Sequence, residues 1–122
     1  YPQTELKKLL GAYGIGLMAW YPLGHGDKAL LQEAVFAALG KKYGKSNAQI
    51  ILRWHIQSGN VVIPGSKNPA HIRENFDVFD FALTEEEMAQ IAAVSKALRY
   101  YNGTPEMIAG YKAWAPDFDA QL

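Results

Sequence analysis

Apolar residues recur at helical spacing along most of this chain, and two short segments have a different pattern. Residues 15–20 and 61–64 are runs of mostly apolar residues without polar alternation, which predicts strands buried on both faces. The remaining pattern predicts helices from Thr4 to about Gly14 and over 30–43, 48–57, 68–76, 84 to about 98 and about 106–114. The chain is therefore expected to be an α/β protein with many helices and few strands.

Polar residues and glycines mark the ends of these helices. Thr4 can cap the first helix, and Gly14 and Gly44 stand where a glycine ends a helix. Residues 46–49 and 84–87 form capping boxes, in which Ser or Thr is followed three residues later by Gln or Glu. These signals support the helix boundaries drawn from the apolar spacing.

Two strands separated by long helical connections indicate parallel pairing. A parallel sheet of two strands is not a stable domain by itself, since sheets usually need more strands. Two interpretations remain open. The chain is either a compact helical domain with a small ribbon or part of a larger α/β sheet or barrel, and the type of strand favours the second.

Length and charge restrict the possible functions. With 122 residues, 49% hydrophobic and 20% charged, the chain is globular and large enough for one core. Its 12 basic and 12 acidic residues cancel, so no overall charge attracts nucleic acid or an anionic membrane, although a local patch is still allowed. The lack of cysteine excludes disulfides and thiolate zinc sites and fits the cytoplasm. No apolar run approaches a membrane span, and the start at Tyr1 without Met suggests upstream residues.

Residues 61–81 carry the strongest indication of binding. A predicted strand ends at a Pro-Gly-Ser turn, and Asn68 and Pro69 then open a short helix. Unpaired N–H groups at a helix N-terminus attract anions, so this segment predicts a phosphate site.

Four motifs in this order resemble the C-terminal part of the aldo-keto reductases: residues 19–24 (AWYPLG), 48–54 (AQIILRW), 62–66 (VIPGS) and 73–81 (RENFDVFDF). The resemblance covers about residues 1–98. It implies part of a (β/α)8 TIM barrel, with 15–20 as the seventh strand and 61–64 as the eighth. Residues 84–98 would be the extra C-terminal helix. Residues 1–122 would thus form the C-terminal part of one barrel domain, in which 99–122 is the tail that closes over substrate.

The resemblance implies hydride transfer between NADPH or NADH and a small-molecule carbonyl. The family's catalytic Tyr, Lys, Asp and His lie in the first half of the barrel, so no catalytic residue is assigned here. The chain would work with the rest of its own barrel, which can be supplied as a separate ordered segment. The alternative is a non-catalytic nucleotide-binding or interaction module on the same barrel.

The resemblance also implies cofactor contacts at both strand ends. Trp20 would stack on the nicotinamide, while Tyr21, Leu23 and Gly24 would run along the pyrophosphate. The remaining expected cofactor residues follow the second strand: Gly65, Ser66 and Lys67 in the turn, then His71, Glu74 and Asn75, with Ser66 on phosphate and Glu74 and Asn75 on adenine.

Two of these positions depart from the family pattern for NADP, which has Lys before the Ser and Arg five residues after it. Gly65 and His71 stand there instead. Lys and Arg hold the 2′-phosphate by charge-assisted bonds, which Gly65 lacks and a mostly neutral His71 provides weakly. Lys67 or Arg73 can compensate in part. We therefore expect the intact enzyme to accept NADH, alone or alongside NADPH.

Each of these residues also has a purely structural explanation. Trp20 can be barrel packing, Ser66 a turn cap, His71 a solvated residue, and Glu74 and Asn75 ordinary helix surface. Several other residues are expected to have no chemistry or an undecided role. They are Trp54 and His55 (packing on the outer helix), Glu85–Glu87 (helix N-terminal charge, not a metal site), His25 (cofactor loop or solvent), and Tyr100, Tyr101 and Trp114 (substrate contact or cover).

Overall fold

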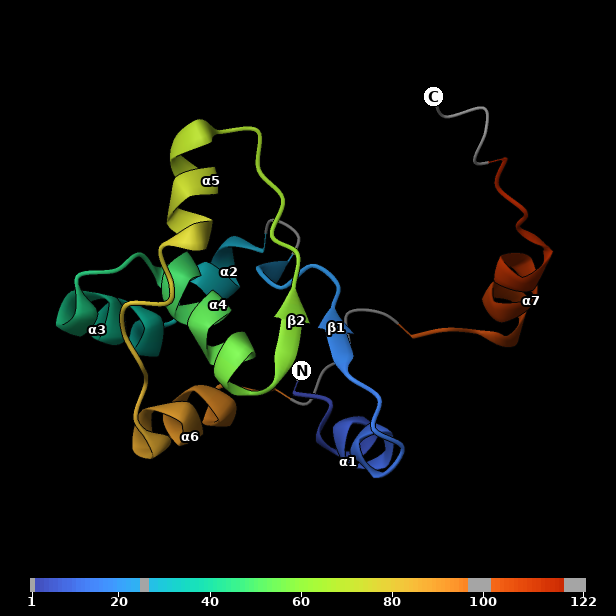
Figure 1. Ribbon diagram of the computed structural model, residues 1–122, viewed down its shortest axis with the longest axis horizontal. Coiled ribbons are helices and arrows are strands. Elements are labelled where there is room, and N and C mark those ends of the chain that lie inside the picture. Colours follow the sequence, from blue (N-terminus) through green and yellow to red (C-terminus); the bar gives the residue numbers. More distant parts are fainter. Residues whose placement is uncertain (1, 25–26, 97–101, 118–122) are drawn as a thin grey trace.

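The computed structural model describes residues 2–24, 27–96 and 102–117. His25, Leu98, Tyr100 and Tyr101, which entered the expectations above, lie outside the described residues. Figure 1 shows α3, α4 and α6 on one side of a small sheet and α7 set apart from the other elements. The elements in chain order are α1 (Thr4–Ala12), β1 (Leu17–Ala19), α2 (Lys28–Leu31), α3 (Ala34–Tyr43), α4 (Asn47–Gln57), β2 (Asn60–Val62), α5 (Pro69–Phe76), α6 (Glu85–Ala93) and α7 (Pro105–Ala113).

The two strands pair in parallel, with Leu17 opposite Asn60 and Ala19 opposite Val62. Their connection runs through α2, α3 and α4, which supplies the long crossover that parallel pairing needs. The expected parallel pair joined by helices is confirmed. Each strand is only three residues long, and β2 begins at Asn60 rather than at Val61.

One face of this sheet is open within the described chain. Met18 and Val61, which pair across the strands, are 61% and 54% exposed. Side chains alternate between the faces of a strand, and α4 packs against β2 on the other face only. The prediction that both strands are buried on both faces is therefore wrong for this chain, because the described helices cover a single face.

The hydrophobic core lies between α3, α4 and α6. Ile50 on α4 is fully buried, and Leu39 and Ile91 reach it from the other two helices. Burying an Ile or Leu side chain stabilises a fold by roughly 1.5–3 kcal/mol, so these contacts hold the three helices together. The buried cluster consists of Phe36, Leu39, Ile50, Ile51, Leu83 and Ile91.

The ends of α1 agree only partly with the sequence. Thr4 is the first helical residue, and Gln3 occupies the N-cap position without a side-chain cap bond. The prediction that Thr4 caps α1 is wrong, since a capping side chain must come from the non-helical residue before the helix. Gly14 ends the helix as expected. Its φ is +67°, and its N–H and that of Ile15 bond to carbonyls of the last turn in a Schellman arrangement.

The single helix expected over 30–43 is divided into α2 and α3. Asp27 caps the earlier helix by accepting a bond from the Ala29 N–H at 2.9 Å. Glu33 then adopts extended backbone geometry and begins α3. Leu30 and Val35, on either side of the break, both pack on the same core, so apolar spacing alone did not reveal it.

Both capping boxes are confirmed. The Ser46 N–H donates to Gln49 Oε1 at 2.8 Å, and the Thr84 N–H donates to Glu87 Oε2 at 2.8 Å. The helix capped by Thr84 is shorter than predicted: α6 ends at Ala93 rather than at about residue 98.

Glu87 has a second role that the capping pattern did not predict. Its side chain accepts hydrogen bonds from Lys42 Nζ at 2.6 Å and from the Tyr43 hydroxyl at 2.6 Å, both from α3. Burial opposes the ionisation of Glu87, but the bonds from Lys42, Tyr43 and the Thr84 N–H outweigh it and lower its pKa to about 2. Glu87 is therefore a charged link between α3 and α6.

Candidate functional site

A pocket of about 550 Å³ opens at the carboxyl ends of β1 and β2. Because the strands are parallel, the segments that follow them meet at the same edge of the sheet. The volume of this pocket falls in the range of about 300–1,000 Å³ that is usual for small-molecule sites. The lining residues are Met18, Ala19, Trp20, Tyr21, Pro22, Leu23, Ile63, Pro64 and Gly65.

The structure brings together four of the ten expected cofactor residues in this pocket. They are Trp20, Tyr21, Leu23 and Gly65. The pocket also uses five residues that the sequence analysis missed: Met18, Ala19, Pro22, Ile63 and Pro64. Each missed residue lies within two positions of an expected one on the same two segments, so the parallel pairing together with the motifs was a signal that could have found them.

Trp20 and Tyr21 present an aromatic surface at the mouth of the pocket. Trp20 is 71% exposed, and the two ring centroids lie 4.3 Å apart at an interplanar angle of 36°. Tyr21 has a φ of 48°, in the left-handed region that bulky side chains rarely adopt. Such a conformation costs about 1–3 kcal/mol and is commonest at functional sites.

Gly24 shapes the loop without lining the pocket. Its φ is +76°, and a Cβ at this position would lie 2.8 Å from the Leu30 Cδ2. Its N–H donates to the Tyr21 carbonyl at 2.9 Å, and its carbonyl accepts from the Asp27 N–H at 3.0 Å. The positive φ therefore favours a glycine here, and a Cβ would also require the flexible Leu30 side chain to shift.

The turn before α5 bonds two of its backbone N–H groups to its own side chains. The Asn68 N–H donates to the Ser66 hydroxyl at 3.1 Å, and the Ala70 N–H donates to Asn68 Oδ1 at 2.9 Å. Pro69 has no N–H to offer. Among the described residues, the N–H groups of Ser66, Lys67 and His71 have no hydrogen-bond partner, so they are left for an anion together with the Ser66 hydroxyl proton.

The other expected residues lie along α5, outside the pocket lining. His71 is exposed, while Glu74 and Asn75 are half-buried. Their spacing of three and four residues places them on one side of the helix. Lys67 is exposed in the preceding turn. The structure therefore shows one group of expected residues in the pocket and a second group on the turn and α5.

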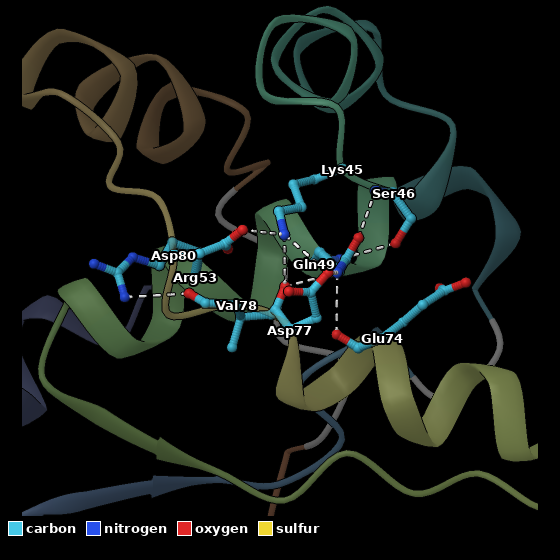
Figure 2. A network of polar contacts seen from close by, with 8 residues as sticks. All are labelled: Lys45, Ser46, Gln49, Arg53, Glu74, Asp77, Val78 and Asp80. Atoms are coloured by element: carbon cyan, nitrogen blue, oxygen red, sulfur yellow. Dashed lines mark hydrogen bonds and ion pairs between the residues drawn. The ribbon is translucent and has the colours of Figure 1, made fainter.

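A polar network fastens the end of α5 to α4 (Figure 2). Gln49 Nε2 donates to the Glu74 carbonyl at 3.2 Å and to the Asp77 carbonyl at 2.7 Å. Lys45 Nζ forms ion pairs with Asp77 at 2.9 Å and Asp80 at 2.8 Å. The Glu74 side chain points away from this network in Figure 2. The capping role of Gln49 was predicted from its spacing to Ser46, whereas these contacts with α5 were not predicted.

The buried titratable groups are not suited to proton transfer near neutral pH. Burial lowers the pKa of His55 to about 4, and its ring lies 3.0 Å from the Asn60 amide. The hydrogen bond to Glu87 raises the pKa of Tyr43 above its ordinary value of 10.0. Within residues 2–24, 27–96 and 102–117, no three His, Cys, Asp or Glu side chains are arranged to hold a metal ion. No helix in these ranges is long and apolar enough to cross a bilayer.

Comparison with known proteins gives a consistent result. A model of the aldo/keto reductase family matches residues 1–96. An aldo-keto reductase from Mycobacterium sp. (strain JLS) is 47% identical over 98 residues, and the methylglyoxal reductase DkgA of Escherichia coli (strain K12) is 42% identical over 97. Each match covers 80% of this chain and 35% of the relative.

One of the solved structures that match this chain contains a bound cofactor. The crystal structure of a Gox0644 mutant in complex with NADPH matches with a TM-score of 0.76 and 34% identity, over 82% of this chain and 36% of that one. The chain therefore spans about a third of the length of the proteins it matches. Its fold is consistent with part of the barrel of such proteins.

Proposed function

We propose a cofactor-binding role for this chain, which belongs to the aldo/keto reductase family. The protein it serves would be an NAD(P)H-dependent oxidoreductase that reduces aldehydes or ketones to alcohols. In this proposal β1 and β2 are the seventh and eighth strands of the barrel, and α6 is the extra C-terminal helix. The chain alone would not turn over substrate, because the proton donor would lie in the rest of the barrel.

The observation that carries this proposal is the pocket at the shared carboxyl ends of β1 and β2. Active sites of TIM barrels lie on this face, and phosphate groups bind beside the last two strands. Trp20 offers an exposed flat ring against which a nicotinamide can stack. The bound cofactor would supply the hydride, and the residues of this chain would hold and orient it.

The phosphate end would rest on the turn before α5. The local bonds leave available the Ser66 hydroxyl proton and the N–H groups of Ser66, Lys67 and His71. Lys67 would add a positive charge from the same turn. Glu74 and Asn75, further along α5, would bond to the adenine.

Cofactor choice would depend on Gly65 and His71. A Cβ added at Gly65 would meet no atom within 4 Å, so a longer side chain fits there. A bond to a charged group contributes roughly 1.5–3 kcal/mol, so the absence of Lys and Arg would weaken NADPH by about ten- to several-hundred-fold relative to a Lys/Arg site. We propose that the enzyme accepts NADH for this reason.

The test follows NADPH and NADH oxidation by the purified protein with small aldehydes at pH 7.5, after mass spectrometry has established the length of the polypeptide. The wild type should use both cofactors. Gly65→Lys/His71→Arg should raise the ratio of kcat/KM for NADPH to that for NADH by ten- to several-hundred-fold. Gly11→Lys, at another glycine with nothing within 4 Å, is the control for added charge and should leave the ratio unchanged.

Other outcomes would contradict parts of the proposal. A thousandfold preference of the wild type for NADPH would refute the NADH prediction. In a polypeptide that mass spectrometry shows to be long enough for the whole barrel, saturable quenching of tryptophan fluorescence by NADPH without turnover of any aldehyde would favour the non-catalytic nucleotide-binding alternative. Neither binding nor turnover would refute the cofactor role itself.

A further inference from the structure

Helix α5 has little apolar anchorage in the described chain. None of its residues is buried, and its apolar side chains Ile72 and Phe76 are 42% and 73% exposed. A helix without buried side chains lacks the packing that normally fixes its position. The position of α5 therefore depends strongly on the polar bonds that reach it.

Those bonds converge on its C-terminal end and come from α4. Gln49 is 4% exposed, and its Nε2 donates to the carbonyls of Glu74 and Asp77. The Glu74 carbonyl also accepts the Asp77 N–H at 3.1 Å, and the Asp77 carbonyl also accepts Lys45 Nζ at 3.3 Å, so the bonds from Gln49 join the helix end to α4 in addition to these contacts. Among the described residues, the N-cap Asn68 bonds to the first turn of this helix, and Gln49 is the side chain from another element that bonds directly to one of its residues.

Gln49 is itself held rigidly. Its Oε1 accepts the Ser46 N–H at 2.8 Å in the capping box, which fixes its amide orientation. Ile50 and Ile51, the next two residues, are buried in the core. The Gln49 side chain therefore holds the end of α5 at a fixed position relative to the core.

Lys45 supports the same turn from outside. Its side chain is 8% exposed and pairs with Asp77 and Asp80. The hydrogen bond from Lys45 lowers the pKa of Asp77, which keeps that carboxylate charged at neutral pH. The turn after α5 is thus held by the Gln49 amide from the first turn of α4 and by the Lys45 ammonium from the residue before the α4 N-cap (Figure 2).

We propose that Gln49 is a positioning residue for the adenosine end of the cofactor. It fixes the last turn of α5 and thereby the two residues there, Glu74 and Asn75, that would meet adenine. This inference rests on the cofactor role proposed above. Gln49 touches no cofactor itself and acts through the helix.

Gln57, eight residues further along α4, provides a matched control. Its Nε2 donates to the Leu83 carbonyl at 2.9 Å, and its Oε1 accepts the Leu83 N–H at 2.8 Å. It therefore makes the same kind of bonds from the same helix to a segment other than α5. Changing either Gln to Glu keeps the acceptor and removes the donor.

The experiment compares three cofactors in the full polypeptide. NADPH and NADH contain the adenosine end, whereas reduced nicotinamide mononucleotide lacks it. Gln49→Glu should raise KM for NADPH and NADH by at least about tenfold, since the bonds to the two carbonyls and to Asp77 Oδ2 are lost and the new carboxylate repels that of Asp77. The KM for the mononucleotide should stay within twofold. Gln57→Glu should change all three cofactors by similar small factors.

The selective loss for NADPH and NADH in Gln49→Glu alone would support the positioning role. Equal losses with all three cofactors, no loss with any, or the same selectivity in Gln57→Glu would overturn it. If Gln49→Glu does not fold, Lys45→Met serves as the second variant, because it loosens the same turn and should show the same selective rise in KM for NADPH and NADH. A Lys45→Met variant without this selectivity would overturn the positioning role. A wild type that oxidises the mononucleotide and NADPH normally keeps the proposed function whichever way the variants behave.

Discussion

The buried carboxylate of Glu87 is expected to be a large electrostatic contributor to stability. Glu87→Gln keeps the size of the side chain and removes its charge. A pKa lowered from 4.5 to about 2 corresponds to roughly 3 kcal/mol. Because the Lys42 side chain is 55% exposed, solvent screens part of this interaction. We therefore expect the free energy of unfolding to fall by about 2 kcal/mol at pH 7.

The sign of the pH dependence follows from the direction of the shift. A lowered carboxylate pKa gives stability that is fully present above 4.5 and is lost as the pH falls toward 2. The assay is urea unfolding of wild type and Glu87→Gln at several values between pH 7 and pH 2.5, followed by circular dichroism. The wild type should lose its advantage over the variant within that window.

Glu85→Gln is the control, because Glu85 is an exposed residue in the same first turn of α6. It removes a charge from the helix N-terminus without touching Lys42 or Tyr43, so its effect should be small. Equal effects of the two substitutions, or a Glu87→Gln variant with the wild-type stability at pH 7, would refute the reasoning from the Lys42 and Tyr43 bonds.

Two further predictions concern other parts of the molecule. His55 has a pKa of about 4 in the folded state against an ordinary 6.5, so the unfolded state takes up the proton first as the pH falls. The free energy of unfolding should therefore decrease by up to about 3 kcal/mol between pH 6.5 and pH 4. The His55→Gln variant should lack this pH dependence of unfolding, and an unchanged dependence would contradict its assignment to His55. Gly24→Ala should destabilise the protein by about 1–3 kcal/mol because of the φ of +76° and the close approach to Leu30. Gly11→Ala is the control, because this glycine has open space around it, and it should not be destabilising. Thermal unfolding of the two variants tests this, and equal midpoints would contradict the backbone strain inferred at Gly24.

Local signals predicted the local structure well. The capping boxes at Ser46 and Thr84, the glycine end of α1 and the parallel pairing of the strands all depend on residues close in sequence or on one general rule of chain connection. The division of the helix at Glu33 was missed because the apolar stripe runs on across the break. The open face at Met18 was missed because a strand's composition does not say which face its neighbours cover.

In the candidate site, too, local features were predicted from the sequence and long-range contacts were not. The aromatic residue Trp20 and the turn glycine Gly65 were found from motifs and do line the pocket. The bonds from Gln49 to Glu74 and Asp77 join residues 25 and 28 positions apart. A side-chain contact over such a separation leaves no periodic trace in one sequence, so the support of α5 required the structure.

The two-stranded sheet also has a consequence for assembly. In the described chain, β1 and β2 pair only with each other, so each strand offers one open edge of backbone donors and acceptors. Open edges recruit any extended segment, including a second copy of the same strand. Two open edges beside one bare apolar face are the geometry that ring closure of a barrel completes, and in its absence the same geometry promotes aggregation. Co-production with a complementary polypeptide should therefore increase the soluble yield of this chain.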